Sequence, residues 1–360
     1  MDSVKDCNRP MTNRTGNKRM SKPPLRPEEL DISLEDLNRK RQPGYRKDTE
    51  TEAFLRRMNQ ALQALEAPLY RDYPIEHPFI FIFGLPRSGT TLISQLLAHG
   101  LDAGYINNLA ARFWLAPLHG IRLARNVLGN QKQISFRSNY ARTAPPGDIH
   151  EFGYFWRHWL KKETLADVVF VKEREAQIDW PALRRVLSTI QREFGKPWVA
   201  KNVLGAYHVE KLKHLLDKVL FVYIERDPLD VAVSILEARK KYYTDLNTWW
   251  SYTPVEFHLL KDLDYWQQIA GQIYFLRRYY HAQIAAIGED QVVRVQYEQM
   301  CQRPASVLEQ VQERAHQLFG YDLKRDLEPP ERFPLRRYED REEEKRRFAR
   351  TIEAFQEKYG

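Results

Sequence analysis

The chain has 360 residues, of which 43% are hydrophobic, and its 56 Lys and Arg against 48 Asp and Glu give a formal net charge of +8. This apolar content excludes a chain that is disordered throughout, and the length suits one large domain with appendages or two small domains. The two cysteines, Cys7 and Cys301, exclude a disulfide framework and a cysteine-rich zinc site. The positive charge suits an anionic ligand but does not distinguish a nucleotide from a nucleic acid or a membrane.

The N-terminal segment contains little apolar periodicity. Residues 1–50 are rich in charge, Pro and Asn, so we expect a disordered arm there, followed by an N-terminal helix within 51–75. The first twenty residues lack the apolar region of a secretion signal. No apolar stretch approaches the ~20 residues that cross a bilayer. We therefore expect a soluble, cytoplasmic protein.

Four short apolar runs alternate with helical patterns and indicate a core domain over 76–330. The runs lie at 79–83, 198–202, 219–224 and 291–295, and helical patterns follow the first three of them. This alternation predicts an α/β fold with a P-loop-type parallel sheet flanked by helices. Between the first two runs we expect a mostly helical insertion over 105–195. The remaining predicted helices lie at 261–287, 304–319 and 338–357, the last within a charged C-terminal tail, 331–360.

The turn after the first run has the form of a phosphate-binding loop. The sequence GLPRSGTT over 84–91 keeps both glycines of the pattern GxxxxGK[ST] and its final hydroxyl, but a threonine replaces the lysine. Backbone N–H groups in such a turn and the following helix N-terminus attract anions. The missing lysine suggests a donor without a triphosphate, and a tight turn with chance glycines is the alternative. The predicted ligands of the phosphate are Arg87, Ser88, Gly89, Thr90 and Thr91.

The string PRSGTT resembles the 5′-phosphosulfate loop of sulfotransferases that use 3′-phosphoadenosine 5′-phosphosulfate (PAPS), in the branch with bacterial and tyrosylprotein enzymes. The resemblance extends over about 79–320. It implies PAPS as co-substrate, adenosine 3′,5′-bisphosphate as product, and no metal. A weaker match is the segment from Tyr297 to Pro304, which resembles the family's "YE.L..P" segment.

A second anion site is expected after the third run. Arg226 follows that run where open α/β sheets bind ligands, Pro228 starts a helix, and Ser234 lies about two turns into it. The pair resembles the family's 3′-phosphate motif, an Arg with a Ser eight positions later. From the residues alone, a surface ion pair of Arg226 with Asp230 is equally open.

The resemblance also suggests catalytic residues. Arg87 would stabilise the departing phosphate oxygen, and Lys201, after the second run, would be a second cation, although it could also be an ordinary surface lysine. The general base is expected in the Pro- and Gly-rich segment 144–153, as His150 or Glu151. The choice between them is open, and so is a purely structural role in which Asp148 or Glu151 caps a helix at 152–160.

The predicted activity is in-line transfer of a sulfuryl group from PAPS to a hydroxyl of a glycan, glycolipid or small molecule, with no nucleic acid partner. The oligomeric state is open. The alternatives are a P-loop kinase or NTPase, which would need a lysine before Thr91 and Mg²⁺, and a non-catalytic module that binds nucleotide or nucleic acid. Six aromatic residues are candidates for the acceptor side, although ordinary core packing is the commoner role for any single one: Trp156, Trp159, Tyr242, Tyr243, Trp249 and Trp250.

Overall fold

The computed structural model describes residues 30, 32–129, 131–139 and 142–360. Four strands form a parallel sheet: β1 (Phe79–Gly84), β2 (Trp198–Lys201), β3 (Val219–Glu225) and β4 (Val292–Gln296). Their order is β2-β1-β3-β4. The predicted α/β fold with a P-loop-type sheet is confirmed, and every strand end lies within one residue of the predicted end.

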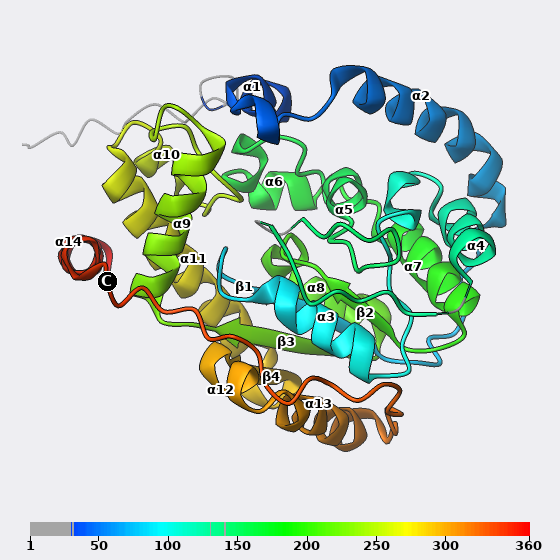
Figure 1. Ribbon diagram of the computed structural model, residues 1–360. Coiled ribbons are helices and arrows are strands. Elements are labelled where there is room, and N and C mark those ends of the chain that lie inside the picture. The colour runs from blue at the N-terminus through cyan, green and yellow to red at the C-terminus, as the bar shows by residue number, and fades with distance from the viewer. Residues whose placement is uncertain (1–29, 31, 130, 140–141) are drawn as a thin grey trace, which may run out of the picture.

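Helices cover both faces of the sheet (Figure 1). The helices that directly follow β1, β2 and β3 are α3 (Thr90–Gly100), α8 (Val209–Leu216) and α9 (Pro228–Tyr242), while α12 (Tyr297–Gln302) and α13 (Pro304–Phe319) follow β4. The other described helices are α1 (Leu34–Lys40), α2 (Thr49–Glu66), α4 (Pro117–Leu128), α5 (Gly153–Trp159), α6 (Val171–Glu175), α7 (Trp180–Phe194), α10 (Phe257–Leu260), α11 (Tyr265–Ile287) and α14 (Glu342–Tyr359). Within the described residues, every helix is too short or too polar to cross a bilayer.

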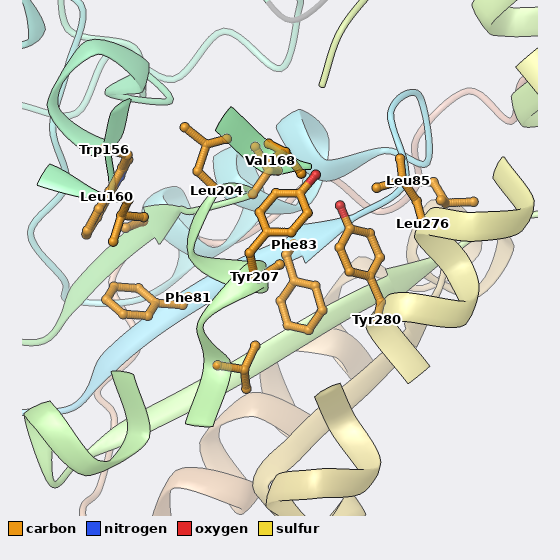
Figure 2. Close-up of a cluster of buried hydrophobic side chains, with 14 of the residues drawn as sticks. Phe81, Phe83, Leu85, Trp156, Leu160, Val168, Leu204, Tyr207, Leu276 and Tyr280 are labelled. Carbon is orange, nitrogen blue, oxygen red and sulfur yellow. The ribbon is translucent and has the colours of Figure 1, made fainter. Parts of the chain in front are cut away.

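The strands alternate their side chains between two apolar cores, because successive side chains of a strand point to opposite faces. Phe79, Phe81 and Phe83 of β1 belong to the core that includes residues of α5, α7, α8, α9 and α11. Ile80 and Ile82 belong to the other, with residues of α3 and α13. Figure 2 shows part of the first core, where Phe81 and Phe83 lie beneath side chains from several helices. Both faces of β1 are therefore buried, as the unbroken apolar run predicts.

The N-terminal segment differs from the prediction. Residues 1–29 and 31 lie outside the described residues, but 34–40 form α1 instead of continuing a disordered arm. Ser33 caps α1 by accepting a hydrogen bond from the Asp36 N–H at 3.0 Å, and Leu37 is buried in the core. The backbone N–H of Gln42 donates to the Tyr242 carbonyl at 2.8 Å, so the segment after α1 is fixed to the end of α9.

The predicted helix over 261–287 starts too early. The chain forms the short helix α10, turns, and begins α11 at Tyr265, because the Asp264 side chain caps α11 by accepting from the N–H groups of Trp266 and Gln267. Within the insertion, the described residues between α4 and α5, 129, 131–139 and 142–152, form an irregular segment that contains the candidate base residues.

Candidate active site

A cleft of about 1310 Å³ opens at the carboxyl ends of the strands. It is lined by the loop after β1, by Lys201 at the end of β2, by Arg226 after β3 and by Tyr297 after β4. In the order β2-β1-β3-β4, the next strand in the chain, β2, lies on one side of β1, and the strand after it, β3, lies on the other side. Ligands bind at such switch points in open α/β sheets. The cleft is therefore where the topology predicts a ligand site.

The loop after β1 has the strained backbone of an anion-binding turn. Gly89 has φ +102°, and a Cβ there would lie 2.7 Å from the Tyr297 ring, so only glycine fits. Arg87 also has a positive φ, +69°, which costs about 1–3 kcal/mol in a residue with a side chain. Ser88 is fully buried and its hydroxyl donates to the Leu85 carbonyl at 2.8 Å, so it braces the loop from inside. Ser88 is not part of the cleft lining, whereas its neighbours Arg87 and Gly89 are.

The two predicted anion motifs contact each other directly. Arg87 donates from Nε to Ser234 Oγ at 3.1 Å, and Arg226 donates to the Arg87 carbonyl at 3.0 Å. Arg226 also lies over the Tyr297 ring, with 4.5 Å between its guanidinium carbon and the ring centroid. Ser234 is buried and is not part of the cleft lining.

The alternative ion pair between Arg226 and Asp230 is not formed. Asp230 instead pairs with Lys345 of α14 at 2.8 Å and accepts a hydrogen bond from the Tyr338 N–H. Arg226 is 9% exposed as a residue, and its guanidinium donates to the carbonyls of Arg87 and Arg336. Arg226 is therefore held at the floor of the cleft and not on the outer surface.

Lys201 joins the phosphate loop to the candidate base. Its ammonium donates to Thr91 Oγ1 at 3.1 Å and forms an ion pair with Glu151, and the side chain is only 6% exposed. Burial would raise the pKa of Glu151, but the charge and hydrogen bond of Lys201 outweigh burial and hold the pKa below its ordinary value. The surface-lysine alternative for Lys201 is therefore wrong, and Glu151 is a carboxylate at neutral pH.

His150 is fixed as a hydrogen-bond donor toward the cleft. Its Nδ1 lies 2.8 Å from the Phe152 backbone N, and because a backbone N–H can only donate, Nδ1 carries no proton. The neutral ring therefore carries its proton on Nε2. Although the imidazole is open to the cleft, the burial of this region lowers the pKa of His150 to about 4, with Glu151 opposing the shift and Lys47 and Lys201 adding to it.

Asp148 braces the segment that carries the candidate base. Its buried carboxylate accepts from Gln95 of α3 at 3.0 Å and from the Ser135 hydroxyl at 2.6 Å. The N-terminus of α5 has no side-chain cap, so the alternative in which Asp148 or Glu151 caps that helix is wrong.

Several residues of the cleft were not expected from the sequence as site residues. Arg157 of α5 lines it, and so does Tyr252, which donates to the Gly84 carbonyl at 2.6 Å. Arg336 also lines it; it belongs to the basic tail, for which the sequence allows either a solvated helix face or a cover over the nucleotide. Arg157 and Tyr252 have no local motif that marks them as site residues. Of the predicted acceptor-side aromatics, Trp156, Tyr242, Tyr243 and Trp250 line the cleft, whereas Trp159 and Trp249 do not. No group of three or more His, Cys, Asp or Glu side chains placed to hold a metal ion occurs among the described residues.

A known protein family and several solved structures resemble this chain. A model of the sulfotransferase family matches residues 78–317, two thirds of the chain. No curated protein of similar sequence matches. Among solved structures, the chain is similar to sulfotransferase STF9 from Mycobacterium avium, with 17% identity, 89% of this chain and 80% of that chain covered, and a TM-score of 0.47. It is also similar to sulfotransferase STF1 from Mycobacterium tuberculosis H37Rv, with 17% identity, 84% and 85% covered, and a TM-score of 0.46.

Proposed function

The chain belongs to the sulfotransferase family, and we propose that it transfers a sulfuryl group from PAPS to a hydroxyl of a glycan, glycolipid or small-molecule acceptor. The observation that carries this proposal is the pair of contacts that joins the two anion motifs, Arg87 to Ser234 and Arg226 to the Arg87 carbonyl. Two anion sites this close together suit one ligand that has a phosphate at each end.

In the proposed complex, the backbone N–H groups from Gly89 to Thr91 at the N-terminus of α3 bind the 5′-phosphosulfate. Arg226 and Ser234 bind the 3′-phosphate, for which an arginine fork with a hydroxyl is suited. Arg87 already contacts Ser234, so its guanidinium lies between the two sites. Ser88 supports the loop from within.

The proposed reaction is an in-line displacement at sulfur. The acceptor oxygen forms a bond to sulfur, while the bond between sulfur and the bridging oxygen of the 5′-phosphate breaks, leaving adenosine 3′,5′-bisphosphate. Arg87 and Lys201 offset the charge that develops on the bridging oxygen. The acceptor hydroxyl loses its proton to a carboxylate or imidazole within hydrogen-bond reach.

Glu151 is the better candidate for that base. It has a free carboxylate oxygen and lies next to Lys201, whereas the unprotonated nitrogen of His150 already accepts the Phe152 N–H. His150 can therefore donate a hydrogen bond from Nε2 to the acceptor but cannot take its proton there without rearranging. In the proposed complex, the Lys201 ammonium interacts with the phosphosulfate of the donor. Its ion pair with Glu151, which makes Glu151 a weaker base, is then weaker.

A P-loop kinase or NTPase fits the same geometry less well. Thr90 occupies the place of the lysine that spans the β- and γ-phosphates, and the Lys201 ammonium lies beside Thr91, the hydroxyl that ligates Mg²⁺ in those enzymes. A fixed cation at that place would compete with the metal.

Calorimetry separates the two functions. We expect adenosine 3′,5′-bisphosphate to bind without added Mg²⁺, and Arg226→Ala to weaken this binding at least ten-fold while Arg350→Ala, on the exposed side of α14, leaves it unchanged. Tighter binding of ATP with Mg²⁺ than of the bisphosphate would overturn the proposal in favour of the kinase or NTPase.

A further inference from the structure

The cleft contains more positive charge than the proposed donor can neutralise. Of the described residues that line it, ten are Lys or Arg and two are Glu. PAPS brings roughly four negative charges, since a phosphate monoester carries close to two at neutral pH. A surplus of positive charge therefore remains after the donor is bound, and its position indicates what else the cleft binds.

Part of that surplus comes from segments other than the phosphate loop and lies near the candidate base. We define the roof cluster as Arg41, Lys47 and Arg142, from the segment after α1 and from the irregular segment before α5. The guanidinium carbons of Arg41 and Arg142 lie 5.5 and 5.8 Å from the centre of the same ring, that of Tyr242. Tyr242 ends α9, eight residues beyond Ser234, or about 12 Å along the helix at 1.5 Å per residue.

Few carboxylates neutralise the positive charge of the roof cluster. Lys47 pairs with Glu52 at 3.3 Å, but no carboxylate of the described residues forms an ion pair with Arg41 or Arg142. Arg41 contacts the Asn38 side chain at 3.4 Å, and Arg142 donates to the Tyr45 carbonyl at 3.3 Å. Burial lowers the pKa of Lys47, and the charges of Arg41 and Arg142 lower it further, whereas Glu52 opposes them. The three cations therefore repel one another, and an anion placed among them would relieve that repulsion.

The cluster lies on the acceptor side of the reaction centre. The charge of Lys47 is close enough to lower the pKa of His150, and Arg142 precedes His150 by eight residues in the same segment. The predicted 3′-phosphate residue Arg226 instead contacts the Arg336 carbonyl and the Tyr297 ring. Aromatic rings accompany the cluster, because Tyr242 and Trp250 both line the cleft, with their ring centres 6.1 Å apart.

From this arrangement we infer that the acceptor carries an anionic group, a carboxylate, phosphate or sulfate, which Arg41 and Arg142 bind, next to a flat face that packs on Trp250. Calling the bound molecule an acceptor rests on the proposed function. The existence of the anion subsite does not depend on that function. An acidic sugar unit or an acidic aromatic glycoside has the required chemistry: an anionic group next to a hydroxyl and a flat face.

A matched pair of probes tests the subsite: 4-nitrophenyl β-D-glucuronide has a carboxylate where 4-nitrophenyl β-D-glucoside has a hydroxymethyl group. Binding of each is measured by calorimetry to the protein alone and to the protein with adenosine 3′,5′-bisphosphate. We expect the glucuronide to bind at least ten-fold more tightly than the glucoside in both states. Equal binding of the two probes, or no binding of the glucuronide, would overturn the inference.

Variants locate the preference. Arg41→Gln with Arg142→Gln should remove it, Arg142→Gln alone should reduce it, and Arg350→Gln should leave it unchanged; the single Arg142 variant remains informative if the double variant unfolds. A preference that survives both cluster variants contradicts the inference, and so does a cluster variant that weakens bisphosphate binding instead, since the cluster would then serve the nucleotide. Failure of the bisphosphate to bind the wild-type protein would refute the proposed function, while the two probes would still decide whether the anion subsite exists.

Discussion

Glu151 and His150 are adjacent in the chain but have opposite hydrogen-bonding capacity. The ion pair with Lys201 keeps Glu151 a carboxylate, and the Phe152 N–H leaves His150 with its proton on Nε2. Neighbouring backbone and charge therefore decide which of two plausible bases is able to accept a proton. The amino-acid types alone do not.

Glu151→Gln should lower kcat at least about a hundred-fold, because general-base catalysis contributes 10²–10⁴-fold, and should leave the affinity for adenosine 3′,5′-bisphosphate unchanged. His150→Gln should act mainly on KM for the acceptor. Because the pKa of Glu151 is held below its ordinary value and a base works only when deprotonated, wild-type kcat should stay constant as the pH falls from 8 through 6. Near-normal kcat in Glu151→Gln would assign the base to His150. A loss of activity between pH 8 and 6 would contradict both assignments, because the pKa of His150 is lowered to about 4 and that of Glu151 lies below its ordinary value. Steady-state kinetics at several pH values measures both.

Lys162 is a fully buried cation outside the cleft lining. It donates to His208 Nε2, and His208 donates in turn from Nδ1 to Glu175 at 2.7 Å. Burial lowers the pKa of Lys162 to about 7, although Asp167 and Glu175 oppose the shift, and burial lowers the pKa of His208 to about 4. At a pH between the lowered pKa of either group and its ordinary pKa, that group is less protonated in the folded protein than in the unfolded chain.

The free energy of unfolding should therefore depend on pH through Lys162. Stability falls with falling pH wherever the unfolded state binds more protons. Compared with Lys162→Met, the wild type should lose stability as the pH falls from the ordinary lysine value of 10.5 to about 7, and the difference should be constant below that. Urea unfolding followed by tryptophan fluorescence at pH 7 to 9.5 measures this difference. Parallel curves for the two proteins would show that Lys162 titrates normally.

At the scale of elements, the strand–loop–helix unit from β1 to α3 depends on one backbone position. Gly89 adopts φ +102° against the Tyr297 ring, which belongs to α12 after the last strand. The loop is therefore shaped by a residue more than two hundred positions away in the sequence.

Gly89→Ala should abolish binding of adenosine 3′,5′-bisphosphate, because a Cβ 2.7 Å from the Tyr297 ring forces the loop to move. Gly129→Ala is the matched control: Gly129 also has a positive φ, +68°, but a Cβ there meets nothing within 4 Å. The control should cost about 1–3 kcal/mol of stability and leave bisphosphate binding intact. If both variants bind the bisphosphate normally, the shape of the loop is not what binds the phosphate.

At the scale of the whole molecule, the C-terminal tail runs from the cleft, at Arg226, to helix α11. The segment before α14 passes Arg226, which donates to the Arg336 carbonyl, and α14 then packs on α11 (Figure 1). Phe348 of α14 is fully buried, with its ring centre 4.7 Å from that of Trp266. The tail is thus part of the folded unit and supports the predicted 3′-phosphate site.

Phe348→Ala should lower the free energy of unfolding by about 3–5 kcal/mol, the usual cost of removing a buried phenylalanine. Phe54→Ala, in the exposed face of α2 where the side chain is 57% exposed, should change it by no more than about 0.5 kcal/mol. Urea denaturation of the two variants measures the contrast. Similar stabilities would mean that α14 is not packed as described.

The sequence predicted the features that depend on local pattern and missed those that depend on distant contacts. Buried strands and the phosphate loop have their own periodicity and spacing, so β1 to β4 and GLPRSGTT could be located from the sequence. The order of residues 34–47 depends on pairing with the end of α9, and the place of Arg336 in the cleft depends on a contact with Arg226. Neither contact leaves a local signal.

The proposed function depends on one nucleotide that reaches from the loop at Gly89 to the pair Arg226 and Ser234, and the structure of the protein crystallised with adenosine 3′,5′-bisphosphate tests this most directly. We predict the 5′-phosphate on the backbone N–H groups from Gly89 to Thr91 and the 3′-phosphate within hydrogen-bond distance of Arg226 and Ser234. A bisphosphate bound elsewhere in the cleft, or with only one of its phosphates on these residues, would contradict the account.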